Sequence, residues 1–381
     1  MRSTTCTARL IDFVDLRPVH RTCLPRWRRK LQELVKRSQW ILGPEVAAFE
    51  REFADAMGAP FCVATASGTD ALTLALWLAG VSTPEQEVVT TPLSAPFTAL
   101  AIVRAGARVR FADIDENTLL LEPATAEPYL TRNTVAVLPV HLYGQLCDLP
   151  GWKRLASNRQ LALIQDACQA HGAFYCGRAL TEFSHWVAYS FYPTKNLGAL
   201  GDGGALCLAR EGDLEMARAL RDGGRREDHV AVVPGMNSRL DELQAAYLRV
   251  ALEDLPRWNE RRRHLARIYD EELASIPVEL IRPVKRFPER ASVYHLYVVR
   301  ANQREALREY LANHGVRTAI HYPVPLHLQP AFASAGLRPG DLPVAEKATQ
   351  EILSLPFGLH LRESDVRHVA ALIRRFYLGP R

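Results

Sequence analysis

The sequence predicts an α/β protein with a mostly parallel central sheet flanked by helices, followed by a smaller α+β domain. From residue 61 onward, short apolar runs alternate with helical segments, which is typical of strands buried on both faces. The chain has 381 residues, more than one hydrophobic core usually serves, so we expect two domains. The runs expected to form strands are 61–64, 88–90, 109–112, 135–140, 161–164, 187–191 and 205–208.

The region before the first strand is expected to be helical. Residues 1–11 show no pattern and are expected to form an N-terminal extension. Apolar residues at helical spacing predict helices over 24–41 and 45–57, with a Gly-Pro pair between them. Another helix is expected over 70–79, directly after the first strand.

The C-terminal part of the chain shows a different pattern. One long charged helix is expected over 239–270, then a strand over 294–299 and a helix over 304–314. We therefore expect a large domain over 12–255 and a small domain over 256–381.

Composition narrows the class of protein. Hydrophobic residues make up 48% and charged residues 23%, as in an ordinary globular enzyme. The net charge is +5, but the basic clusters lie at helical spacing among apolar residues, so no nucleic-acid partner is expected. The seven cysteines form no Cys-x-x-Cys pair, which argues against a disulfide framework or a metal site and favours the cytoplasm. No apolar stretch is long enough to cross a membrane, and no signal peptide is recognised.

Three polar groups are expected at one edge of the sheet, because ligands bind beyond the carboxyl ends of parallel strands. Lys195 lies on a turn before a glycine-rich loop, where its amine can form a Schiff base. Asp166 ends an apolar run and can keep a pyridine nitrogen protonated. Ser67, Gly68 and Thr69 begin a helix whose free amides can bind a phosphate. Together these groups suit pyridoxal phosphate.

Each of these residues also has an ordinary structural interpretation. Ser67 is a common helix N-cap, and a lone buried aspartate or a lysine in a turn need have no catalytic role. Ser238 and Asp241 resemble a capping box, which leaves Asn237 and Arg239 unexplained.

Several longer motifs, in this order, resemble the DegT/DnrJ/EryC1/StrS family of pyridoxal-phosphate-dependent sugar aminotransferases. The resemblance covers nearly the whole chain from Phe13 onward and implies the fold known as type I. The matching motifs are Ile41-Leu-Gly-Pro-Glu45, Ser67-Gly-Thr-Asp-Ala-Leu72, His141-Leu-Tyr-Gly-Gln145, Asp166-Ala-Cys-Gln-Ala-His-Gly-Ala173, 190–204, 237–246 and Ile320-His-Tyr-Pro-Val-Pro-Leu-His-Leu-Gln329.

The resemblance implies a role for each matching residue. Lys195 would carry the cofactor, Asp166 would bind its ring nitrogen, and Gln169 would lie near its ring hydroxyl. The resemblance also implies a homodimer with shared active sites, since one phosphate ligand would come from the partner subunit. The implied phosphate ligands are Gly68, Thr69, Ser190 and, from the partner, Asn237, and the expected substrate-binding residues are His171, Arg239, His321 and Tyr322.

The resemblance further implies a reaction. The amino group would pass from L-glutamate or L-glutamine to a keto sugar nucleotide by a ping-pong mechanism. Residues 141–145 with 169–171 favour a dTDP-linked 3-keto-6-deoxyhexose. A keto-inositol aminotransferase and a non-catalytic regulatory protein are the alternatives, whereas the dehydratases of the family replace the lysine that stands here at 195. The chain departs from the family pattern at Ala95, where an aromatic residue usually covers the cofactor ring, and Phe97 follows two residues later.

Overall fold

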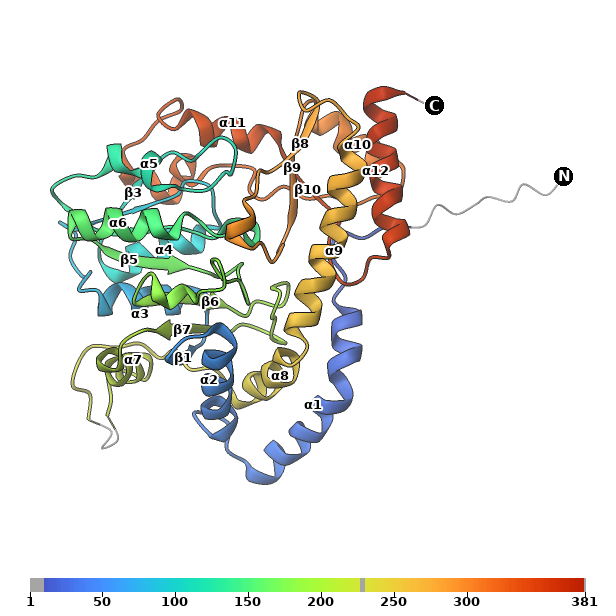
Figure 1. Cartoon of the computed structure of the whole chain (residues 1–381). Helices are drawn as coiled ribbons and strands as arrows, with labels where there is room; N and C mark the ends of the chain where they lie inside the picture. The colour runs from blue at the N-terminus through green and yellow to red at the C-terminus, as the bar shows by residue number, and fades with distance from the viewer. Residues whose placement is uncertain (1–9, 227–229, 380–381) are drawn as a thin grey trace.

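A computed structural model describes residues 10–226 and 230–379 of the chain. Its centre is a seven-stranded sheet with strand order β1-β7-β6-β5-β4-β2-β3, and Figure 1 shows helices on both sides of it. Strand β7 is antiparallel to both neighbours, while the pairs from β6 through β5, β4 and β2 to β3 are parallel. The predicted mostly parallel sheet is therefore confirmed. The strands are β1 Phe61–Thr65, β2 Glu87–Thr90, β3 Arg108–Phe111, β4 Thr134–Leu138, β5 Ala162–Asp166, β6 Trp186–Ser190 and β7 Gly204–Leu208.

Each of the seven apolar runs predicted as strands of the large sheet is one, with ends that differ by at most two residues, and the strand expected over 294–299 begins three residues later, at Tyr297. The helices are α1 Arg17–Arg37, α2 Pro44–Met57, α3 Gly68–Leu78, α4 Pro96–Ala105, α5 Pro123–Ala126, α6 Leu149–Arg159, α7 Leu214–Arg221, α8 Glu242–Leu252, α9 Leu255–Leu273, α10 Arg304–Asn313, α11 Pro343–Glu351 and α12 Glu363–Leu378. None of those within the described ranges is long and apolar enough to cross a bilayer.

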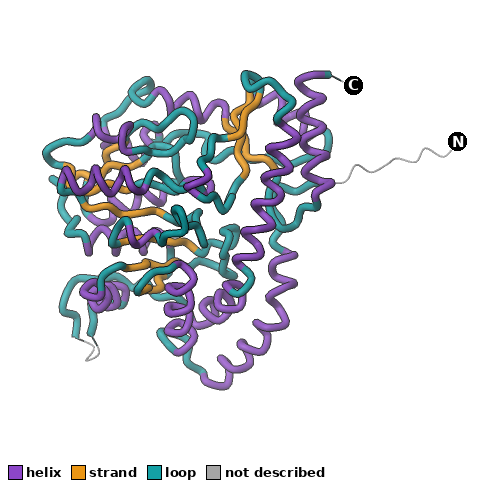
Figure 2. Tube along the Cα trace, viewed as in Figure 1, coloured by secondary structure: helices purple, strands orange, loops and turns teal. Residues whose placement is uncertain are grey.

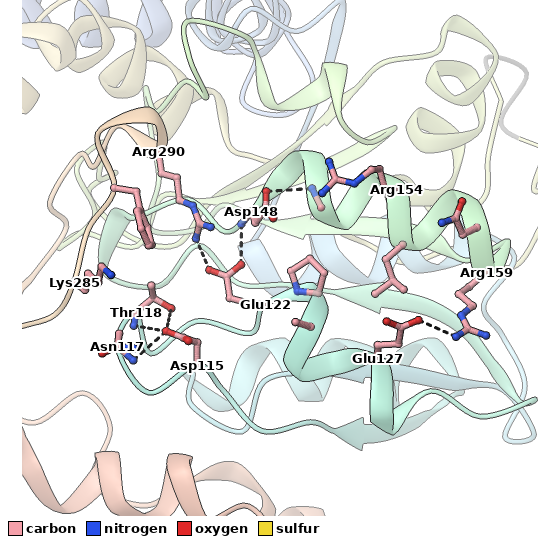
Figure 3. Close-up of a pocket in the computed structure, with 16 residues that line it drawn as sticks. Asp115, Asn117, Thr118, Glu122, Glu127, Asp148, Arg154, Arg159, Lys285 and Arg290 are labelled. Atoms are coloured by element: carbon pink, nitrogen blue, oxygen red, sulfur yellow. Dashed lines mark hydrogen bonds and ion pairs between the residues drawn. The ribbon is translucent and has the colours of Figure 1, made fainter.

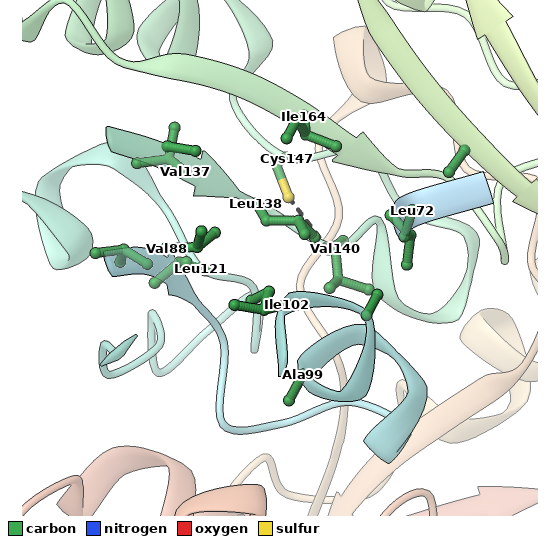
Figure 4. Packing of buried hydrophobic residues seen from close by; sticks show 14 of the residues in the cluster. Leu72, Val88, Ala99, Ile102, Leu121, Val137, Leu138, Val140, Cys147 and Ile164 are labelled. Atoms are coloured by element: carbon green, nitrogen blue, oxygen red, sulfur yellow. Dashed lines mark hydrogen bonds between the residues drawn. The ribbon is translucent and has the colours of Figure 1, made fainter. Parts of the chain in front are cut away.

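Two apolar clusters hold the large sheet between its helices. In the first, Leu72 of α3 and Ile102 of α4 pack with Val88, Val137 and other strand residues (Figure 4). The second joins α2 and α8 to β1, β6 and β7, and the rings of Phe49, Phe53 and Phe191 in it are fully buried. These layers leave the carboxyl edge of the sheet as the place where polar side chains gather.

The C-terminal part forms a second, smaller layer. A three-stranded antiparallel sheet has the order β10-β9-β8, with β8 Ile281–Pro283, β9 Tyr297–Ala301 and β10 Ile352–Leu355. Helix α9 runs from the large sheet to this layer and packs against α12 (Figures 1 and 2). Residues 1–9 of the expected extension lie outside the described residues, and Ile11 is buried where its amide donates to Gly315 O at 2.8 Å.

The single helix predicted over 239–270 is wrong, because the structure has two helices there, α8 and α9. Pro256 lies in the first turn of α9, where a missing amide hydrogen costs nothing, and the chain changes direction just before it. The predicted capping box is also wrong. Asp241 is the N-cap of α8 without a side-chain bond, and Ser238 Oγ instead donates to Asp70 Oδ2 at 2.9 Å.

Candidate active site

Three chain segments meet at the carboxyl edge of the sheet. Strand β5 ends at Asp166, β1 leads into Ser67, and β6 leads into the turn that carries Lys195. Strand β1 is antiparallel to β7 and β7 is antiparallel to β6, so β1 runs in the direction of β5 and β6. Their carboxyl ends therefore lie on the same side, as the sequence predicted.

Asp166 is a buried carboxylate, 4% exposed, with two donors in its surroundings. The Thr98 hydroxyl donates to Oδ2 at 2.7 Å, and the Cys168 amide donates to Oδ1 at 3.1 Å. Thr98 itself lies 3.0 Å from the Ser94 hydroxyl, Oγ1 to Oγ. Sequence analysis missed Thr98, since nothing in its local pattern indicates that α4 places it against β5.

Lys195 is half-buried on the turn that follows β6. Burial lowers the pKa of its ammonium, while Cys168 and Asp166 act in the opposite direction. The amine and the carboxylate are therefore close enough to interact electrostatically. The turn depends on Gly198, since a Cβ there would lie 2.3 Å from Pro193 O. A lysine with a lowered pKa can act as a nucleophile or base near neutral pH.

The start of α3 forms a narrow cradle. Ser67 Oγ caps the helix by accepting from the Asp70 amide at 3.1 Å, so the N-cap interpretation of this serine is confirmed and its part in phosphate binding stays a prediction. The amides of Gly68 and Thr69, in the first turn, have no acceptor four residues back. A Cβ on Gly68 would lie 2.7 Å from the Cβ of Ser190, so the predicted phosphate ligands are neighbours. Only glycine leaves this space open.

These observations fit pyridoxal phosphate. The chain brings together a buried acid for a ring nitrogen, an amine whose pKa is lowered, and a helix N-terminus whose glycine leaves the first-turn amides uncovered by a side chain.

Gln169 and Tyr322 form the next part of the site. Gln169 Oε1 accepts from the Tyr143 amide at 2.7 Å, and its Nε2 donates to the Tyr322 hydroxyl at 3.4 Å. Burial raises the pKa of Tyr322 to about 12, and the charge of Asp166 acts in the same direction. Tyr322 is therefore a neutral hydroxyl close to the carboxylate. His321 Nδ1 lies 2.9 Å from Ser354 Oγ, and its ring stacks on Phe13 at 5.6 Å.

His171 lies behind the site. It has no exposed surface, and its ring lies 5.4 Å from that of Tyr189 and 5.8 Å from that of Phe191. Burial lowers its pKa to about 3. Neither ring nitrogen has a hydrogen-bond partner in the described part of the chain, and the substrate contact expected for His171 stays a prediction.

The remaining predicted residues, Asn237 and Arg239, lie in the segment that precedes α8. Asn237 is exposed on the described chain, where a second subunit can reach it. Arg239 Nη1 donates to Asp222 Oδ1 at 2.9 Å, so its charge is already paired. Neither residue has a recorded bond to Lys195 or Asp166, and their roles stay predictions. Ala95 is the half-buried N-cap residue of α4, and Phe97 is 58% exposed on the same helix. The Phe97 ring is therefore not packed over the site in the described chain.

A larger cavity, of about 720 Å³, lies away from this site (Figure 3). It lies between α5, α6 and the 285–290 loop, and its lining carries as many acidic as basic side chains. A half-buried ion pair between Glu122 and Arg290 lies in its lining. None of the predicted site residues lines this cavity.

The fold and this site define a pyridoxal-phosphate-dependent aminotransferase. The chain belongs to the DegT/DnrJ/EryC1/StrS aminotransferase family, whose model matches residues 25–374.

Relatives and solved structures agree with this membership. The chain is 38% identical to the dTDP-3-amino-3,4,6-trideoxy-alpha-D-glucose transaminase of Streptomyces venezuelae, over 96% of each chain. It is 41% identical to the erythromycin biosynthesis sensory transduction protein EryC1 of Saccharopolyspora erythraea, over 96% of this chain and 99% of that one. It is 40% identical to a pleiotropic regulatory protein of Geobacillus stearothermophilus, over 96% and 98%. The crystal structure of S. venezuelae DesV with a ketimine intermediate superposes with a TM-score of 0.94, at 37% identity, over 98% of this chain and 100% of that one.

Proposed function

We propose that the protein transfers an amino group from L-glutamate or L-glutamine to a dTDP-linked 3-keto-6-deoxyhexose by a ping-pong mechanism. The observation that carries the proposal is the meeting of Lys195, Asp166 and the Gly68 cradle at one edge of the sheet. The sugar is inferred from the transaminase of Streptomyces venezuelae, whose name describes a dTDP-3-amino sugar.

Each residue has a part in this reaction. Bound pyridoxal phosphate supplies an electron sink for the carbon beside the transferred amine. Lys195 Nζ would hold the cofactor and, when free, would accept and return the proton of the reacting carbon. Asp166 keeps the ring nitrogen protonated through a charge-assisted hydrogen bond. Its own position is held by Thr98.

The other predicted residues hold the cofactor and orient the substrate. Gly68, Thr69 and Ser190 bind the phosphate, and Asn237 reaches it from the second subunit of a homodimer. Gln169 lies at the ring hydroxyl and is itself held by Tyr143. His321, Tyr322 and Arg239 border the substrate. A positioned acid–base group contributes about 10²–10⁴-fold to the rate, so loss of Lys195 abolishes turnover.

A regulatory role without catalysis is the second candidate, because two relatives carry regulatory or sensory names. The two functions differ in one test. Purified protein is mixed with pyridoxal phosphate, and its visible absorption is recorded before and after L-glutamate is added. We expect a band that glutamate bleaches, absent in Lys195→Ala and retained in the surface control Lys153→Ala. A wild-type protein without band or bleaching contradicts the proposal.

The acceptor is identified in the second half of the reaction. The glutamate-treated enzyme is separated from free donor and offered a panel of ketones. We expect a dTDP-3-keto-6-deoxyhexose to restore the band. Restoration by cyclitol ketones and by no sugar nucleotide would assign the enzyme to keto-inositol amination.

A further inference from the structure

Arg262, on α9, is a buried cation that forms no ion pair with an acidic side chain of residues 10–226 or 230–379. Its side chain is 9% exposed, and its Nη1 donates only to two main-chain carbonyls, Tyr294 O at 3.2 Å and His295 O at 3.3 Å. Its Nε is buried and has no hydrogen-bond partner in the described part of the chain. Burial lowers the pKa of the guanidinium to about 10, and no acidic group offsets the effect. An unpaired buried charge is costly, which points to an anion that belongs there.

Arg262 lines a cavity of about 110 Å³. The walls are the segment 13–16, the residues around Phe357 to His360, and Thr194. Asp15 is the one acidic residue in this lining, and Arg17 already binds its carboxylate, Nη2 to Oδ2 at 2.9 Å. The guanidinium therefore keeps its charge for a ligand.

The cavity lies beside the proposed catalytic amine. Thr194, the chain neighbour of Lys195, lines it, as do His295 and His321. Burial lowers the pKa of both imidazoles, and the charge of Lys195 acts on both in the same direction. His360 also lines the cavity, and burial lowers its pKa as well. With all three imidazoles neutral near pH 7, Arg262 is the residue in this lining that carries a full positive charge.

We propose that this cavity binds a carboxylate of the amino donor, with Arg262 as the charged contact. The inference rests on the proposed function and adds to it a site for the donor. A planar guanidinium presents paired N–H groups that match a carboxylate. At about 30 Å³ for each water, the cavity holds a carboxylate and a few waters, and it is too small for a nucleoside diphosphate.

The test measures binding of glutarate, an unreactive dicarboxylate that lacks the donor's amine. Calorimetry is done on cofactor-loaded protein, and again on cofactor-free protein in inorganic phosphate, so that the phosphate cradle is occupied in both. We expect Arg262→Met to weaken glutarate binding about 10- to 100-fold, the range for one charge-assisted hydrogen bond. Arg262→Lys, which keeps the charge and loses the fork, should weaken it less.

The matched control is Arg261→Met, which removes a positive charge from the neighbouring position on α9. Arg261 is more exposed and pairs with Glu363 at 3.2 Å, so this variant should bind glutarate like the wild type. In the loaded enzyme the KM for glutamate should rise in the Arg262 variants, while amination by a simple alkylamine, which has no carboxylate, should be unchanged.

The inference is overturned if the wild type does not bind glutarate, or if Arg262→Met binds it as tightly as Arg261→Met. If Arg262→Met does not fold, the inference is overturned when Arg262→Lys binds glutarate as tightly as the wild type. Equal binding would mean that Arg262 is a structural residue whose free N–H bonds water. Failure of the proposed function is seen separately, as a protein that takes up no pyridoxal phosphate whatever its affinity for glutarate.

Discussion

Replacing Thr98 with valine removes one hydroxyl and nearly preserves the shape of the side chain. In the structure this hydroxyl donates to Asp166 Oδ2 at 2.7 Å and lies 3.0 Å from Ser94 Oγ. Thr98 is 2% exposed and Asp166 is 4% exposed, so water has little access to replace the lost donor. The variant therefore isolates the support that α4 gives to the carboxylate.

The expected loss of stability follows from the two contacts. A hydrogen bond to a charged group contributes about 1.5–3 kcal/mol, and a neutral one contributes about 0.5–1.5 kcal/mol. Thr98→Val removes one of each, so the free energy of unfolding of the cofactor-free protein should fall by about 2–4 kcal/mol. Cofactor affinity should fall about tenfold or more, because a carboxylate that is free to turn holds the ring nitrogen less well.

The assay pairs this variant with Thr90→Val. Thr90 is also fully buried, and its hydroxyl donates at the same 2.7 Å, but the acceptor is the neutral carbonyl of Leu138. Urea unfolding should show a loss of about 1 kcal/mol for Thr90→Val and no change in cofactor affinity. Thr98→Ser keeps the hydroxyl and should retain the cofactor absorption. Equal losses in the two valine variants, with unchanged cofactor titration, would refute the reasoning.

Two further predictions concern the cradle and a buried histidine. Gly68→Ala places a Cβ 2.7 Å from that of Ser190, so the free energy of unfolding should fall by about 1–3 kcal/mol and cofactor titration should weaken; an unchanged titration would argue against a phosphate there. His141 is fully buried, and burial lowers its pKa from 6.5 to about 4, although Gln165 and Asp166 act oppositely. Between pH 6.5 and pH 4 the imidazole therefore binds a proton in the unfolded state but not in the folded state. The stability that the protein has above pH 6.5 is lost as the pH falls towards 4. As the pH falls through that window, the free energy of unfolding of the wild type should decrease more steeply than that of His141→Gln, by up to about 1.4 kcal/mol per pH unit. Urea unfolding at several pH values measures both slopes, and equal slopes would contradict the assignment.

Local pattern was sufficient for the strands and for the motifs that follow them. Each strand is a short run of apolar residues buried on both faces, and Asp166 and Lys195 come directly after such runs. Patterns of this kind depend on neighbours in sequence, so a single chain contains them. The single helix expected over 239–270 was wrong because both of its halves have helical spacing, and that spacing hid the break marked by Pro256 in the first turn of α9.

Contacts between segments that are far apart in the chain could not be predicted from the sequence. Ser238 had a complete local explanation as a cap, yet it bonds to Asp70, 168 positions away in the chain. Thr98 bonds to Asp166, 68 positions away in the chain. Only the structure shows that Arg262 lines a cavity.

The amino-acid sequence by itself determined the α/β architecture, the lysine, the acid and the helix start of the site, because these depend on apolar periodicity and short motifs. Only the tertiary structure decided which side chains support them, that His171 is packed behind the site, and that a buried arginine lacks a counter-charge. Those properties arise from burial and from the geometry between elements, which no local stretch of sequence specifies.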